Sequence, residues 1–197
     1  MLAVVLTSKA LSRVHRYTYA EYLAHESASN VKHEFFDGEI YAMAGGSLLH
    51  AALAMRIGAA LVAAARGGPC VVFSSDLKVR ALATGLTAYP DVTVICGPAE
   101  TDPLSDHVAL NPTVVVEVTS PSTEDWDRGE KLDSYRTIPS LRECIVISHH
   151  VRRIEVHLRE PDGRWTVTAA GAGESLALTS LACSLSVDEI YGEGDPR

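Results

Sequence analysis

The fold of this protein is decided by residues 113–119, TVVVEVT, which are almost all β-branched. Such a run predicts a strand that is buried on both faces of a sheet. Glu117 interrupts the apolar run, and a carboxylate in a buried strand is costly unless it is paired or binds a metal ion. Pro90-Asp91 opens an earlier β-prone run, residues 91–96. If the two strands are neighbours, the carboxylates of Asp91 and Glu117 meet at one point of the sheet.

The rest of the sequence predicts a mixed α/β (α+β) fold, in which helices flank a central mixed β-sheet. We expect helices at residues 17–29, 47–66, 120–137 and 187–191, the first of them capped by Thr18 with Glu21 as its capping-box partner. We expect strands at residues 32–36, 39–43, 70–73, 77–82, 91–96, 113–119, 143–148, 153–159, 165–169 and 175–178. The polar segment 98–111, which contains two prolines, predicts a loop.

The composition is typical of a globular protein, with 197 residues of which 47% are hydrophobic and 21% charged. This length suits one domain, which we expect to span residues 1–197. The formal net charge of −8 argues against a protein that coats nucleic acid, because such binding requires a basic surface. It leaves room for a metalloenzyme that acts on nucleic acid, because bound cations offset the charge of their carboxylate ligands.

Each of the four cysteines adjoins an apolar run and none forms a CxxC pair: Cys70, Cys96, Cys144 and Cys183. We therefore favour buried free thiols over a zinc site or a disulfide. Residues 2–6 are too short for a signal sequence, so we expect a cytoplasmic protein. The apolar segment 48–65 is interrupted by His50 and Arg56, which favours a core helix over a membrane span.

The predicted helix after Glu117 carries Asp127, Lys131 and Tyr135, which share one face because they lie at i, i+4 and i+8. A lysine that faces two metal-binding carboxylates could position the attacking water and balance charge on a phosphoryl group. The alternative is an exposed Asp127–Lys131 pair, worth about 0.3–0.5 kcal/mol.

Other residues have a functional and a structural interpretation. Glu34 offers a third carboxylate or is a solvated strand residue, and His50 is a candidate ligand or a satisfied core histidine. For Asp91 and Glu117 the structural alternative is a turn cap and a salt bridge. A basic stretch could contact a phosphate backbone, or could be a charged sheet edge that discourages strand pairing. It contains His149, His150, Arg152, Arg153, His157 and Arg159.

Carboxylate oxygens, waters and a substrate phosphate are the usual ligands of Mg²⁺. Asp91 and Glu117, with Glu34, therefore form a candidate site for Mg²⁺ or Mn²⁺. The sequence contains no P-loop, GxGxxG motif, GxSxG elbow or HExxH motif, so other chemistries have little support.

Several short motifs, in this order and spacing, resemble the Uma2 family of the PD-(D/E)xK, restriction-endonuclease-like superfamily. They are Tyr22-Leu23, Glu34-Phe35-Phe36-Asp37-Gly38-Glu39-Ile40-Tyr41, His50, Pro90-Asp91-Val92, Glu117-Val118-Thr119-Ser120-Pro121-Ser122-Thr123, Asp127, Lys131 and Tyr135. The resemblance covers an expected nuclease-like core at about residues 17–148, and continues more loosely through extra strands at about 151–191.

The resemblance implies roles for particular residues. Asp91 and Glu117 match the two signature acidic residues of the superfamily, and Glu34 matches an upstream glutamate. The usual lysine two positions after the second acidic residue is replaced here by Thr119, and a lysine of the following helix, which maps onto Lys131, is thought to take its place. The resemblance also implies a DNA substrate and, as in many nucleases of this superfamily, a homodimer.

We therefore expect an endonuclease that hydrolyses phosphodiester bonds in DNA with Mg²⁺ or Mn²⁺. Asp91, Glu117 and Lys131 are the expected catalytic residues, and Glu34, His50, Asp127 and Tyr135 are expected to assist them. Two alternatives stay open. One is a catalytically inactive module that binds nucleic acid or a protein, which the acidic net charge and Thr119 favour. The other is a metal-dependent hydrolase that acts on a different phosphoester.

Overall fold

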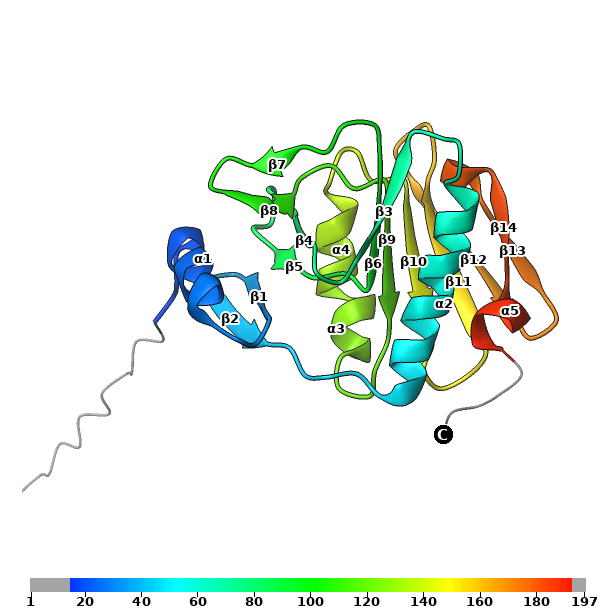
Figure 1. The fold of residues 1–197 in the computed structure, drawn as a ribbon, viewed down its shortest axis with the longest axis horizontal. Helices are drawn as coiled ribbons and strands as arrows, with labels where there is room; N and C mark the ends of the chain where they lie inside the picture. Colours follow the sequence, from blue (N-terminus) through cyan, green and yellow to red (C-terminus); the bar gives the residue numbers. More distant parts are fainter. Residues whose placement is uncertain (1–14, 193–197) are drawn as a thin grey trace, which may run out of the picture.

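The computed structural model describes residues 15–192 and contains two six-stranded sheets and a two-stranded hairpin. Residues 2–6, which we interpreted as too short for a signal sequence, lie outside the described residues. Figure 1 shows α1, β1 and β2 at one end of the molecule and β9 near its middle. No helix in the described part of the chain is long and apolar enough to cross a membrane.

The larger strands form a mixed sheet in the order β12-β11-β10-β9-β6-β3. Its strands are β3 (Cys70–Ser74), β6 (Val92–Cys96), β9 (Val114–Val118), β10 (Glu143–Ile147), β11 (Arg153–Arg159) and β12 (Trp165–Gly171). β9 and β10 run parallel, whereas β9 pairs with β6 in the antiparallel direction. All five residues of β9 are buried, which confirms the strand predicted from the TVVVEVT run.

Helices cover both faces of this sheet, as predicted (Figure 1). Helix α2 (Leu48–Ala64) packs Leu53, Ile57 and Leu61 against Val114, Val116 and Val118 of β9. On the other face, α4 (Glu130–Arg136) packs Leu132 and Tyr135 into a second core that includes Val115. Because successive side chains of a strand alternate between faces, Glu117 points to the same side as Val115, toward α4.

The N-terminal elements belong to the second sheet, whose order is β2-β1-β5-β4-β8-β7. Its strands are β1 (His33–Phe36), β2 (Glu39–Ala42), β4 (Lys78–Arg80), β5 (Thr87–Ala88), β7 (Thr101–Asp102) and β8 (Ser105–Ala109). Helix α1 (Tyr19–Ala28) has the predicted capping box between Thr18 and Glu21. The β1–β2 hairpin turns at Asp37-Gly38, where both residues have positive φ angles (48° and 79°), as expected for an Asp-Gly turn.

Three sequence predictions about secondary structure were wrong. Segment 98–111, which was predicted to be a loop, contains the β7–β8 hairpin, with its turn at Pro103-Leu104. Only two residues of β8 are buried, so the polar composition of the segment concealed the strand. The helix predicted at 120–137 is divided at Gly129 into α3 (Glu124–Arg128) and α4. The last predicted strand forms as β13 (Ser175–Leu178), but it pairs with β14 (Cys183–Ser186) in a separate hairpin instead of joining the central sheet. Helix α5 (Val187–Tyr191) follows as predicted.

The prediction of four free thiols was also wrong. Cys70 and Cys96 form a disulfide, whereas Cys144 and Cys183 are free. The antiparallel pairing of β3 with β6 places Cys70 directly opposite Cys96, a proximity that their separate apolar surroundings in the sequence do not reveal. The cysteines therefore give no support to the reducing compartment that we expected.

Candidate active site

The strands that carry Asp91 and Glu117 are neighbours, which was the condition for their carboxylates to meet. β6 and β9 pair Val92 with Val116, so the register places Asp91 opposite Glu117 one step further along. The carboxylate of Asp91 accepts a hydrogen bond from the backbone N–H of Val118 at 2.7 Å. Asp91 is therefore fixed to the same strand that presents Glu117.

Lys131 lies at the centre of a buried acidic cluster. Its Nζ is 2.8 Å from Oε1 of Glu34, 3.0 Å from Oε1 of Glu117 and 3.3 Å from Oδ1 of Asp127. Lys131 and Asp127 are each only 4% exposed, so the interpretation of this pair as a surface ion pair was wrong. Glu34 is also buried, which contradicts the alternative of a solvated strand residue.

Neutral side chains hold these carboxylates in place. Tyr135 donates its hydroxyl hydrogen to Oε1 of Glu117 at 2.8 Å, and Trp126 donates Nε1–H to Oε2 of Glu34 at 3.2 Å. Thr123 donates to Oδ2 of Asp127 at 2.6 Å. The sequence did not predict these contacts of Trp126 and Thr123. The i, i+4 spacing of Thr123 and Asp127 was a usable signal, whereas nothing in the sequence relates Trp126 to Glu34.

The crowding of charges perturbs the protonation of the cluster. Burial raises the pKa of Glu117 well above its usual value, and the nearby carboxylates of Asp127, Asp91 and Glu34 add to the rise while Lys131 opposes it. Burial alone would lower the pKa of Lys131, but the carboxylates of Glu117, Glu34 and Asp127 raise it above its ordinary value. Lys131 is therefore a permanent cation that cannot serve as a general base near neutral pH.

His50 lies at the other side of Asp91, with Nε2 3.4 Å from Oδ2 of that carboxylate. The carboxylate of Asp91 raises the pKa of His50, against the opposing effect of desolvation. His50 is thus paired with an acidic residue of the site, and it shares this partner with the backbone of Val118.

Replacing His50 with glutamine should reduce stability mainly in acid. Because the folded-state pKa of His50 is raised, its ion pair stabilises the protein fully below the ordinary pKa of 6.5 and is lost as the pH rises through the folded-state pKa. We expect the variant to be less stable by about 1 kcal/mol or less at about pH 5, and by a smaller amount at about pH 8.5. Urea unfolding at both pH values measures this, and an equal loss at the two would contradict it.

The donor set fits a hard divalent cation. Three carboxylates, those of Glu34, Glu117 and Asp127, share the one ammonium group of Lys131. The fourth carboxylate, that of Asp91, is paired with His50 at the edge of the cluster. Such an excess of buried negative charge is unfavourable unless a cation compensates it, and carboxylate oxygens are the ligands that Mg²⁺ prefers. Among the described residues, no three members of this cluster offer ligand atoms that all lie within 4.8 Å of one another. Nζ of Lys131 lies between the oxygens of Glu34 and Glu117.

Thr119 occupies the position at which the superfamily usually has a lysine. It is fully buried, and its hydroxyl lies 2.8 Å from Nδ1 of His149. The positive charge next to Glu117 therefore comes from Lys131 on α4, as the resemblance implied.

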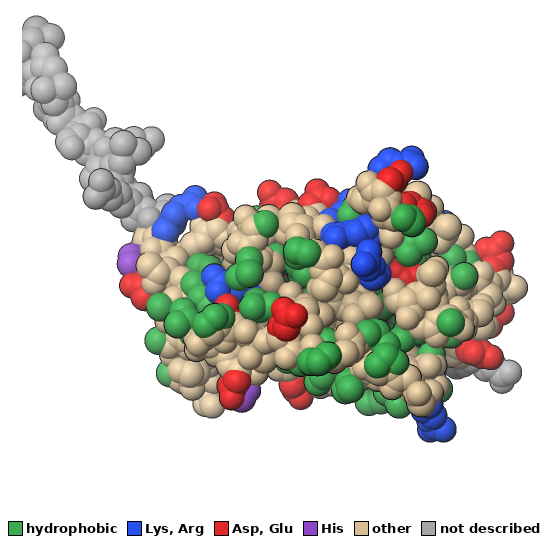
Figure 2. All heavy atoms as spheres, turned by 90° about the horizontal axis from the view of Figure 1, so that it is seen from above, with side chains coloured by type: hydrophobic (Ala, Val, Ile, Leu, Met, Phe, Trp, Pro, Cys, Tyr) green, Lys and Arg blue, Asp and Glu red, His purple; other side chains and the backbone are tan. Residues whose placement is uncertain are grey.

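The basic stretch around β11 does not form a charged sheet edge, so that interpretation was wrong. β11 pairs with β10 on one side and β12 on the other. Arg159 donates to backbone carbonyls of Ile138 and Pro139, and Arg153 pairs with Glu155 at 2.8 Å. On the face in Figure 2, the Lys and Arg side chains of the described residues lie in separate small groups rather than in one continuous band.

With helices on both faces of a mixed sheet and an acidic cluster at the start of β6, the chain has a nuclease-like α/β fold. It is similar to the crystal structure of "a putative nuclease belonging to DUF820" from Anabaena variabilis, with a TM-score of 0.66. The match covers 83% of this chain and 91% of that one at 13% sequence identity, so it shows the fold.

The chain belongs to the Uma2 family. The model of this family, described as "Putative restriction endonuclease", matches residues 19–188. Two uncharacterised proteins of Synechocystis are relatives. One is 39% identical over 87% of this chain and 89% of its own length, and the other is 32% identical over 85% and 91%.

Proposed function

We propose that this protein is an endonuclease that hydrolyses phosphodiester bonds in DNA with the aid of Mg²⁺ or Mn²⁺. The observation that carries the proposal is the buried cluster in which Lys131 contacts Glu34, Glu117 and Asp127, next to the strand partner Asp91. The family description and the nuclease-like fold support the reaction class.

Asp91 and Glu117, with Glu34, would hold the metal ion. When bound, such an ion supplies Lewis acidity toward the phosphate and a water of lowered pKa. Lys131 supplies a fixed positive charge that balances the negative charge developing on the phosphoryl group. Tyr135 and Trp126 keep Glu117 and Glu34 oriented through their hydrogen bonds, and His50 does the same for Asp91.

The direct test is cleavage of supercoiled plasmid and of single-stranded DNA with Mg²⁺, Mn²⁺ or EDTA, beside the Asp91→Ala variant. We expect nicking that needs the metal and falls by at least about 100-fold in the variant, since a metal ligand is lost. A matched control is Asp106→Ala, because the Asp106 side chain is exposed and its carboxylate pairs with the exposed His107 rather than with a residue of the cluster. Cleavage that is unchanged by EDTA or by Asp91→Ala would refute the proposal.

A second function is a binding module of this fold without catalysis. Thr119 in the usual lysine position and the scattered surface cations favour it. Calorimetric titration with Mn²⁺ separates the two functions, because a pure interaction module should have no metal site that Asp91→Ala removes. Activity on small phosphodiesters with none on DNA would instead indicate a different phosphoesterase.

Two further parts of the proposal concern the whole protein. A homodimer would present two sites to the two strands of a duplex, and sedimentation equilibrium tests it. A cytoplasmic location has the Cys70–Cys96 disulfide as the observation against it, and cell fractionation tests it.

A further inference from the structure

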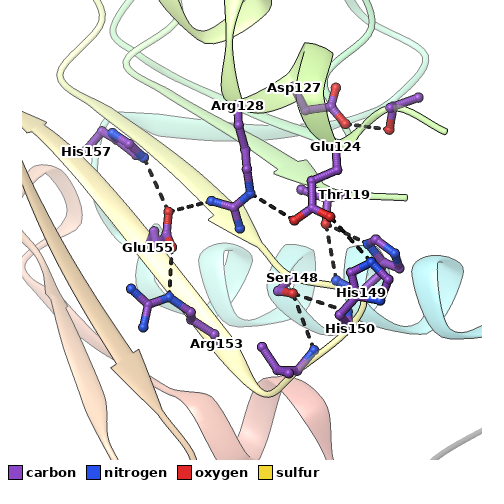
Figure 3. A network of polar contacts seen from close by, with 12 residues as sticks. Thr119, Glu124, Asp127, Arg128, Ser148, His149, His150, Arg153, Glu155 and His157 are labelled. Carbon is purple, nitrogen blue, oxygen red and sulfur yellow. Dashed lines mark hydrogen bonds and ion pairs between the residues drawn. The ribbon is translucent and has the colours of Figure 1, made fainter. Parts of the chain in front are cut away.

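A second group of potential metal ligands lies outside the acidic cluster. It consists of Glu124 at the start of α3 and of His149 and His150 in the turn after β10 (Figure 3). One ligand atom from each of these residues lies within 4.8 Å of the other two. Oε2 of Glu124 is 3.4 Å from Nε2 of His150, and the two imidazole rings have centroids 3.6 Å apart. Among the described residues, this is the one such group of three.

His149 has the hydrogen-bonding arrangement of a metal ligand. Its Nδ1 lies 2.8 Å from Oγ1 of Thr119, whose oxygen also accepts the backbone N–H of His149 at 3.2 Å. Its Nε2 is buried and has no hydrogen-bond partner. Metal-binding histidines usually engage one ring nitrogen with a neighbouring group, which fixes the ring and leaves the other nitrogen for the metal. A buried imidazole nitrogen without a partner is otherwise unfavourable.

Arg128 orients the carboxylate of Glu124 through the oxygen that does not face His150. Arg128 donates Nε–H to Oε1 of Glu124 at 3.1 Å, which leaves Oε2 directed at His150 (Figure 3). Arg128 is itself paired with Glu155 at 2.7 Å, so its charge is shared between two carboxylates. Thr119 and Arg128 thus hold two of the three candidate ligands in place before any metal arrives.

We propose that Glu124, His149 and His150 form a second metal site, for a divalent transition metal such as Zn²⁺. Two imidazoles and one carboxylate suit Zn²⁺ and related ions, whereas Mg²⁺ prefers oxygen ligands alone. The set supplies three protein ligands and leaves the remaining position open to water or to an anion. This site is chemically distinct from the all-carboxylate cluster around Lys131.

A metal at this site would connect elements that lie next to the acidic cluster. Glu124 lies three residues before Asp127 on α3, and Thr119 lies two residues after Glu117. A bound ion would therefore join the helix that carries Asp127 to the turn after β10, next to the end of β9. Its occupancy would stabilise the position of α3 without using any ligand proposed for Mg²⁺.

Calorimetric titration with Zn²⁺, using protein without a histidine tag, tests this site directly. We expect one Zn²⁺ per chain, at least tenfold weaker binding in His150→Gln and in Glu124→Gln, and about 10–100-fold weaker binding in Thr119→Val. Both ligand residues lie near the surface, so these variants should fold, and circular dichroism checks this. A Co²⁺ absorption spectrum that changes in the same variants gives a second readout independent of activity.

Two controls make the result decisive. His107→Gln removes an exposed histidine that also lies 3.4 Å from a carboxylate, that of Asp106, and it should leave Zn²⁺ binding unchanged. Asp91→Ala should also leave Zn²⁺ binding unchanged, so the test of the second site does not depend on the proposed nuclease activity. No stoichiometric Zn²⁺ binding, or equal affinity in the wild type and in both ligand variants, would overturn the proposal.

Discussion

Lys131→Met is expected to abolish DNA cleavage and to destabilise the protein by about 3–5 kcal/mol, the range seen when one partner of a buried ion pair is removed. The reason is the position of Nζ among Glu34, Glu117 and Asp127, each within 3.3 Å. Without the ammonium group these buried carboxylates repel one another and must take up protons. We therefore expect the loss of stability to be larger at neutral pH than near pH 4, where carboxylates protonate more readily.

Urea unfolding and plasmid cleavage measure the two effects of Lys131→Met. Lys32→Met is the matched control, because Lys32 also pairs with a carboxylate, Asp76 at 2.7 Å, but this aspartate side chain is 84% exposed. The control should cost about 1 kcal/mol or less and leave cleavage intact. If Lys131→Met were as stable and as active as Lys32→Met, the central role of Lys131 would be wrong.

Glu117→Gln should have opposite effects on activity and on stability. Cleavage should fall by at least about 100-fold, because the amide is a poorer metal ligand and carries no charge. The metal-free protein should become more stable at neutral pH by about 0.5–2 kcal/mol, the size of a typical stabilising substitution at a strained functional site. Glutamine keeps an oxygen that can accept the hydrogen bond from Tyr135.

The pH dependence of this effect follows from the pKa of Glu117, which burial raises well above its usual value of 4.5. The unfolded chain loses this proton at lower pH than the folded protein does, so the wild type loses stability as the pH rises from about 4.5 through the folded-state pKa. The stability difference between Glu117→Gln and the wild type should thus be small near pH 4 and grow toward pH 7. A constant difference would count against the raised pKa.

Glu143→Gln is the matched control for this substitution. Glu143 is as deeply buried in the neighbouring strand, but its two oxygens accept hydrogen bonds from the backbone N–H groups of Thr179 and Ser180 at 2.7 and 3.0 Å. An amide NH₂ group would face one of these donors, so Glu143→Gln should destabilise the protein and leave metal-dependent cleavage intact. Stabilisation by both substitutions would show that burial alone, rather than charge crowding, explains the result at Glu117.

The sequence was most informative where local pattern and environment agreed. The β-branched run of β9, the capping box of α1 and the Asp-Gly hairpin each depend on short-range chemistry, and the structure confirms all three. The i, i+4, i+8 spacing of Asp127, Lys131 and Tyr135 also placed them correctly on one face, even though Gly129 divides the helix. The break at Gly129 leaves Lys131 in contact with Asp127 and Glu117, and Tyr135 donates a hydrogen bond to the same Glu117.

Features that depend on pairing between distant segments were not predictable from the sequence. The Trp126–Glu34 hydrogen bond joins residues 92 positions apart, and the contact of Thr119 with His149 requires β9 and β10 to run side by side. The short strands β5, β7 and β8 hold few buried residues, so they carry almost no periodic signal. The roles proposed for the site residues stay predictions until the variants are measured.

The disulfide between Cys70 and Cys96 closes a covalent ring that includes strands of both six-stranded sheets. The ring starts in β3, leaves for β4 and β5 in the other sheet, and returns through Pro90-Asp91 to β6. Closing a loop of this length restricts the unfolded chain by about 3–4 kcal/mol in the loop-entropy model. The segment that contains Asp91 is thereby held at both ends, so separation of the sheet that contains β4 and β5 cannot move this carboxylate far from Glu117.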